Sequence, residues 1–138
     1  MARSALWAVG LALAVSGCGS SKDGPLADAA QSTFYQQLAA KNYQAIYDAA
    51  SPELKQGIAG PTFIGFLQRV DRKMGVCQSP VKTANWRFNY TTNGYYQDQG
   101  YTRVCANGTL TETVSIVVRN GQAQLFGFHT DNPLLMTD

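Results

Sequence analysis

The sequence has little charge and almost no histidine. Only 14% of its 138 residues are Asp, Glu, Lys or Arg, and the formal net charge is +2. Nucleic-acid-binding proteins usually carry a strongly basic surface, which a net charge this small does not suggest, so no nucleic-acid partner is expected. His129 is the only histidine. Because a zinc site uses about four ligands, neither a metal site nor a cofactor is expected.

Catalytic signatures are also lacking. The sequence has no Gly-rich phosphate loop and no Gly-x-Ser-x-Gly nucleophile elbow. His129 and Asp131 are close enough in sequence to suggest a base and the group that orients it. However, no partner nucleophile is indicated, and a surface histidine at a strand end is the simpler interpretation. The sequence therefore favours a protein that is not an enzyme.

Long hydrophobic runs are missing as well. The apolar stretch at residues 5–15 is shorter than the roughly 20 residues that a membrane-spanning helix needs. Arg3 precedes it, and the small residues Ser16 and Gly17 follow it. A positive start, a short apolar core and small residues before a cleavage point are typical of a secretory signal. Residues 1–17 are thus predicted to be a signal peptide. Cys18 starts the mature chain on one interpretation. On the other, a plain secretory signal, it is lost with the signal peptide or stays as a free thiol.

The cysteines are few, and their number is informative. Setting Cys18 aside leaves Cys77 and Cys105, an even pair in an exported protein, where conditions are oxidising. A disulfide is the expected state, and two buried free thiols are the alternative. Closing a loop of this span stabilises a domain by roughly 3–4 kcal/mol in the chain-entropy model.

What remains after the signal is the size of one domain. Residues 18–26 are rich in Ser and Gly, which predicts a flexible tether. Helical spacing of apolar residues then predicts helices at residues 29–40, 43–50 and 61–75, with an irregular or briefly helical link at residues 51–58. Gly60-Pro61 starts the last of these, and Gly75 ends it.

Beyond Cys77 the hydrophobic period changes to two, which is typical of strands. Strands are predicted at residues 86–90, 101–106, 112–119 and 122–129, with a polar tip or loop at residues 95–100. Asn120-Gly121 is a strong signal for a two-residue hairpin turn. Helices followed by an antiparallel meander indicate an α+β domain, residues 27–130, with a tail at residues 131–138. The last helix is expected to lie against the sheet.

Two groups of aromatic residues are candidate binding sites. Trp86, Phe88 and Tyr90 share one face of a strand, where they form ordinary core or line an apolar ligand pocket. Three tyrosines also cluster around the expected tip, Tyr95, Tyr96 and Tyr101. Tyrosine at an exposed tip suits recognition, because it offers contact area at low entropy cost. The alternative is a loop that folds back on the domain.

The sequence resembles small bacterial lipoproteins with a cystatin-like, nuclear-transport-factor-like domain, most of them of unknown function. The motifs that carry the resemblance are Val15-Ser16-Gly17-Cys18, Phe34-Tyr35 with Leu38, residues 43–47, residues 63–75, residues 112–118 and residues 121–128. The resemblance implies a curved sheet wrapped on a long helix. It supplies no catalytic residues.

The first of these motifs resembles a lipobox. In that family the cysteine is diacylated through its sulfur and the chain is cut before it. The resemblance therefore implies a lipid anchor at Cys18, which would hold the domain on a membrane because two or more acyl chains bind stably. Gly19 is not the aspartate that signals inner-membrane retention, which favours the outer membrane in a cell that has two.

Together these observations predict a bacterial envelope lipoprotein that acts as a non-catalytic binding module for an envelope protein or other envelope component. The alternative is a small-ligand carrier or enzyme, with a pocket between the last helix and the Trp86–Tyr90 strand.

Overall fold

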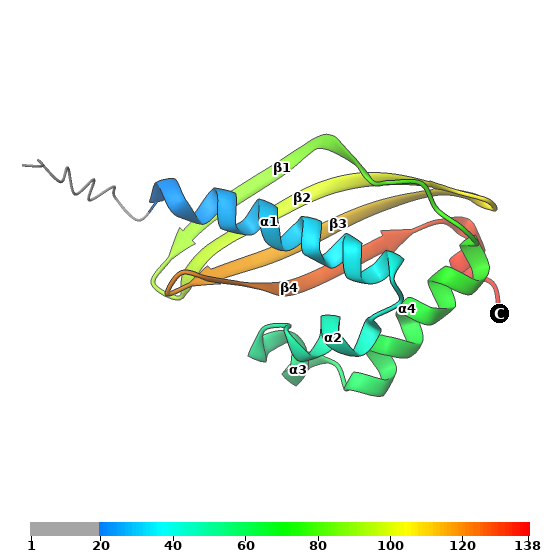
Figure 1. Ribbon diagram of the computed structural model, residues 1–138, viewed down its shortest axis with the longest axis horizontal. Coiled ribbons are helices and arrows are strands. Elements are labelled where there is room, and N and C mark those ends of the chain that lie inside the picture. Colours follow the sequence, from blue (N-terminus) through cyan, green and yellow to red (C-terminus); the bar gives the residue numbers. More distant parts are fainter. Residues whose placement is uncertain (1–19) are drawn as a thin grey trace, which may run out of the picture.

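The computed structural model describes residues 20–138. The predicted signal peptide and Cys18 lie outside the described residues. Helices make up the first half of the described chain and strands most of the second half (Figure 1). The elements are α1 (Ser20–Ala39), α2 (Tyr43–Asp48), α3 (Pro52–Gly57), α4 (Gly60–Met74), β1 (Val81–Thr91), β2 (Gly94–Cys105), β3 (Gly108–Arg119), β4 (Gln122–Asp131) and the 3-10 helix η1 (Pro133–Met136).

α1 is longer than the sequence predicts. Residues 18–26 were expected to form a flexible tether, but the helix begins at Ser20 and contains Pro25. Ala27 and Gln31 are fully buried in this helix. Most helical stability in proteins comes from packing of a buried face, which here outweighs the unfavourable local preferences of Gly and Pro. The segment is therefore part of the folded domain from Ser20 onward.

The shorter helices follow the sequence signals. The link is briefly helical rather than irregular, as α3 shows, and the Ser51 hydroxyl caps this helix by accepting a bond of 3.3 Å from the Leu54 amide. α4 begins at Gly60 with proline in its first turn, as predicted. It ends at Met74, and Gly75 follows it with a φ of 74°, a left-handed value that glycine adopts without strain.

The strands form one antiparallel sheet in the order β1-β2-β3-β4, which confirms the predicted α+β class and its meander. The sheet is open and curved (Figure 1). Asn120 and Gly121 both have positive φ, 51° and 73°, as a type I′ turn between β3 and β4 requires. Residues 95–100 are not a tip or a loop, because they continue β2.

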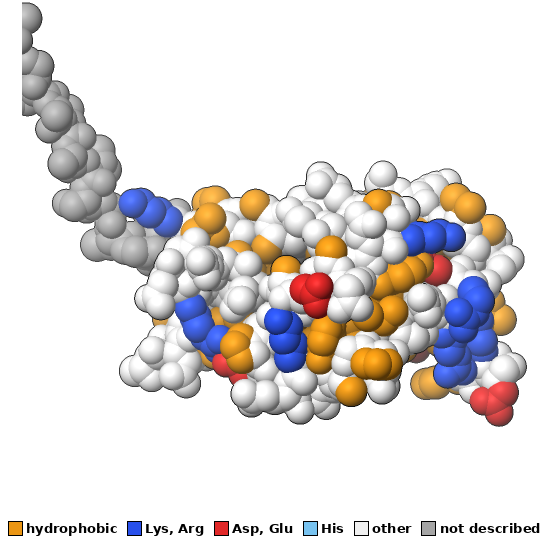
Figure 2. Space-filling view, turned by 60° about the horizontal axis from the view of Figure 1, so that its bottom comes forward, with side chains coloured by type: hydrophobic (Ala, Val, Ile, Leu, Met, Phe, Trp, Pro, Cys, Tyr) orange, Lys and Arg blue, Asp and Glu red, His pale blue; other side chains and the backbone are white. Residues whose placement is uncertain are grey.

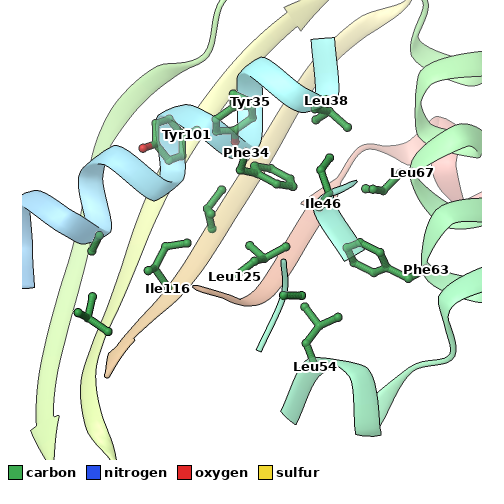
Figure 3. Packing of buried hydrophobic residues seen from close by; sticks show 14 of the residues in the cluster. Phe34, Tyr35, Leu38, Ile46, Leu54, Phe63, Leu67, Tyr101, Ile116 and Leu125 are labelled. Carbon is green, nitrogen blue, oxygen red and sulfur yellow. The ribbon is translucent and has the colours of Figure 1, made fainter. Parts of the chain in front are cut away.

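α1, rather than α4, covers the sheet. α1 runs diagonally across one face and contacts β2, β3 and β4, while α4 packs against α2 and η1 (Figure 1). Side chains from α4 still enter the same core: Phe63 and Leu67 point toward Phe34 of α1 and Leu125 of β4 (Figure 3). The periodicity of α4 correctly identified a buried face, but the expected partner of that face was wrong.

A disulfide ties the helical part to the sheet. The sulfur atoms of Cys77 and Cys105 lie at bonding distance, as the predicted pairing requires. Cys77 follows α4 and Cys105 ends β2, so the link joins two segments that are 28 residues apart. Met74 and Leu110 are fully buried beside it in a second, smaller hydrophobic cluster.

The carboxyl-terminal tail is held against α4. Arg69 donates a hydrogen bond of 3.0 Å to the Leu135 carbonyl, and Lys73 donates one of 3.0 Å to the Leu134 carbonyl. These bonds fix η1, which the sequence did not predict, on the surface of the helix.

On the side of the molecule that Figure 2 presents, hydrophobic side chains reach the surface in several patches, with charged side chains scattered between them. Within residues 20–138, no helix has both the length and the apolar character needed to cross a membrane.

The packing of the core can be tested by replacing a leucine with alanine at a buried position and at an exposed one. Leu67 is 1% exposed and Leu134 is 39% exposed. L67A is expected to lower the free energy of unfolding by about 2–5 kcal/mol, because it leaves a cavity. L134A is expected to change it by less than about 1 kcal/mol. Chemical denaturation measures both, and equal losses would contradict this packing.

Candidate binding surface

Trp86, Phe88 and Tyr90 form an exposed aromatic row on β1. Their side chains point to the same face because residues two apart in a strand do so. Phe88 pairs with Gln97 of β2, whose amide donates a bond of 2.8 Å to Asp28 of α1, so the row shares the face that α1 covers. The three rings are nevertheless 49%, 51% and 46% exposed.

The exposure follows from the path of α1. Its contacts with the sheet are concentrated on β2, β3 and β4, which leaves β1 beyond its edge. The interpretation of the row as ordinary core is therefore wrong. Because large apolar side chains are seldom exposed side by side on a soluble protein, the row is a candidate interaction surface.

The rings of the row touch one another and one buried neighbour. The ring centroids of Trp86 and Phe88 are 4.9 Å apart, and those of Phe88 and Tyr90 are 6.1 Å apart. The Tyr95 ring lies 4.8 Å from that of Tyr90. The row thus forms a continuous surface that is backed by the core.

The other tyrosines do not form an exposed tip. Tyr95 and Tyr101 are buried in β2, and Tyr96 is half-buried on the opposite face, against Phe126 and Arg119. The expectation of a recognition loop is therefore wrong, because these residues belong to β2. The polar residues between the tyrosines suggested a loop, but two of them, Gln97 and Gln99, are buried and hydrogen-bonded within the fold.

A buried ion pair lies beneath α1. Arg103 donates two hydrogen bonds to Glu112, of 2.8 and 3.0 Å, and both side chains are almost fully buried. The Tyr35 hydroxyl donates a third bond of 3.0 Å to the same carboxylate. The sequence interpretation missed this cluster. The Asn107-Gly108 turn could have revealed it. When residues are paired strand to strand away from this turn, Arg103 and Glu112 fall on the same face of neighbouring strands.

Burial makes ionisation of Tyr35 and Tyr101 still less favourable than it is in water. It raises the pKa of Tyr101 to about 12, with a smaller contribution from the negative charge of Asp28. Burial, and then the charge of Glu112, raise the pKa of Tyr35 far above its usual range. Both hydroxyls therefore act as hydrogen-bond donors, Tyr101 to the Gln31 side chain at 2.7 Å.

A groove of about 680 Å³ lies between the second half of α1, the segment after α4 and β2. Its lining includes Tyr35, Leu38, Val76, Pro80, Tyr101 and Arg103. Lys82 of β1 also lines it, so the groove and the aromatic row follow the same side of α1. The sequence interpretation placed a pocket between α4 and the Trp86–Tyr90 strand, and the structure places the groove elsewhere.

His129 is remote from the groove. It pairs with Thr113 in the sheet, which pairs in turn with Gly100, so it lies on the face opposite Tyr101. His129 is exposed, and Asp131 ends the same strand. A base acting in the groove cannot come from this histidine. Within residues 20–138, no three His, Cys, Asp or Glu side chains are grouped to hold a metal ion.

No known family model matches the chain, and no curated protein matches it.

The buried ion pair can be tested against an exposed one. E112Q leaves the Arg103 guanidinium buried without its counter-charge, so the free energy of unfolding should fall by about 3–5 kcal/mol. Glu53 forms an exposed pair with Arg119, and E53Q should change stability little, because water screens that pair. Urea unfolding at neutral pH measures both variants. Equal losses would contradict a buried pair.

Proposed function

We propose that this protein is a membrane-anchored bacterial envelope lipoprotein whose domain binds another envelope component without catalysing a reaction. The binding surface is the aromatic row on β1. The observation that carries the proposal is the exposure of three touching aromatic rings on the face where the rest of the sheet is covered.

The two edges of the sheet support this choice. On the β4 side, the Ser51 amide donates a hydrogen bond of 2.9 Å to the Leu125 carbonyl, so the segment between α2 and α3 covers part of that edge. Among residues 20–138, no strand pairs with the outer edge of β1. An open edge leaves backbone donors and acceptors available to a partner.

The sequence supports the membrane anchor. Cys18 stands behind a signal-like segment and resembles the acylated cysteine of a lipobox. An anchor there would keep the domain on a membrane surface without a spanning helix.

The groove favours a second candidate function, a carrier or enzyme for a small ligand. Its volume suits such a molecule, and Leu38 and Val76 would contact an apolar part of it. The polar groups on its floor are already paired inside the protein, Tyr35 and Arg103 with Glu112. This pairing leaves them less available to a ligand, so the aromatic row is the better-supported site.

Cell fractionation tests the anchor. The wild-type protein is expected in the membrane fraction as a processed chain, and C18S is expected to lose both processing before residue 18 and membrane retention, because the acylated thiol is gone. C18S/S20C restores a thiol two positions away and should not rescue either property. Normal processing and retention of C18S would contradict the anchor.

Crosslinking in cells tests the binding surface. Phe88 and Asn89 are neighbours on β1 that point to opposite faces. A photo-crosslinking residue in place of Phe88 is expected to form adducts with an envelope component, whereas the same residue in place of Asn89 is not. Adducts of equal yield at both positions, or at Asn89 alone, would rule out the aromatic row as the contact.

A further inference from the structure

We infer that the aromatic row lies against the lipid bilayer that holds the anchor. This inference rests on the proposed lipid anchor and names the component that the row contacts. The open side of the domain, where β1 extends beyond α1, would then face the membrane.

The start of α1 sets how far the domain can stand from the membrane. Only Gly19 separates Cys18 from Ser20, where the helix begins. Since one residue spans at most about 3.6 Å, the Cα atom of an acylated Cys18 lies within roughly 7 Å of the first helical residue. No flexible tether is left to hold the domain away, so some side of it must contact the bilayer surface.

The aromatic row runs alongside the first turns of α1. A Cβ atom on Gly24 would lie 3.7 Å from the Tyr95 hydroxyl, and the Tyr95 ring touches Tyr90. One turn later Asp28 accepts the bond from Gln97, the strand partner of Phe88. At 1.5 Å of rise per residue, these two contacts lie roughly 6 and 12 Å along α1 from Ser20. The row is therefore on the side of the domain that is nearest the anchor.

The chemistry of the row fits a lipid interface. Trp and Tyr rings have an apolar body and a polar end, and they are enriched at the level of lipid headgroups. Lys22 is exposed on the first turn of α1, and Lys82 lies on the same face of β1 as the row. Lys22 suits a surface of anionic headgroups, whereas Lys82 lies 3.7 Å from the Asp28 carboxylate and is partly neutralised by it.

The size of the row favours a bilayer over a second copy or another protein. Large aromatic side chains bury about 150–250 Å² each, so three half-exposed rings offer only about 300 Å². A stable protein interface buries about 800 Å² per partner. A bilayer contact needs less area, because the anchor already holds the domain there and makes the second contact intramolecular.

Tryptophan fluorescence tests the inference directly. The chain has two tryptophans, Trp7 in the predicted signal and Trp86 in the row, so the processed protein carries one probe. The lipidated wild-type protein is placed in vesicles of phosphatidylethanolamine and phosphatidylglycerol, with either ordinary or brominated acyl chains. Brominated chains are expected to reduce Trp86 emission on the order of twofold, as for an indole at the interface.

The matched control moves the probe to the other face of the sheet. Val104 is 49% exposed, as is Trp86, but it alternates with Arg103 on β2 and points away from α1. In the lipidated W86F/V104W variant, emission should not differ between the two kinds of vesicle.

The outcomes separate the inference from the anchor. If the protein does not float with the vesicles, the anchor itself is wrong. If it floats and Trp86 emission is unaffected by brominated lipid, the anchor is supported but the bilayer inference is overturned. The row would then be expected to contact a protein partner. Equal quenching of the wild type and of W86F/V104W also overturns it, because the domain would then have no preferred side.

Discussion

The position of α1 on the sheet is the constraint on which the rest of the structure depends. Burial of Ala27, Gln31, Phe34 and Leu38 holds this helix diagonally over β2, β3 and β4. The same placement buries the Arg103–Glu112 pair beneath the helix and leaves β1 beyond its edge. The position of α1 therefore accounts for both the polar interior and the exposed aromatic row.

The polar interior limits what the groove can do. Tyr35, Arg103 and Glu112 form a closed set of hydrogen bonds, and Tyr101 is bonded to Gln31. The Gln31 amide nitrogen is buried without a hydrogen-bond partner, but no polar atom of Tyr35, Arg103 or Glu112 is left so. Opening the cluster of these three side chains to bind a ligand would cost its bonds. The aromatic row carries no such cost, since its rings are already at the surface. This contrast is why the row, and not the groove, carries the proposed function.

The sequence predicted well those features that depend on neighbours in the chain. Helical spacing located α4 through Phe63 and Leu67, and Asn120-Gly121 located the turn between β3 and β4, because both signals are local. The α+β class and the pairing of Cys77 with Cys105 followed from the order of the elements and the even number of cysteines. The sequence could not show which helix covers the sheet, since that depends on packing between distant segments.

The same limit explains the errors at the candidate site. Alternation shows that Trp86, Phe88 and Tyr90 share a face, but only the path of α1 decides whether that face is covered. The polar Gln97 and Gln99 between Tyr95 and Tyr101 favour a tip on sequence grounds alone. These glutamines are buried because Asp28 and backbone carbonyls satisfy their amides, a compensation that hydropathy does not reveal.

Amide hydrogen exchange in solution tests the central claim, that β1 is an open edge left uncovered by α1. β3 is paired on both sides, and its amides should exchange slowly along its whole length. Between Trp86 and Thr91, amides bonded to β2 should exchange slowly and those on the outer edge rapidly, giving an alternating pattern. Uniform protection along β1, equal to that of β3, would show that another segment covers this edge and would contradict the account.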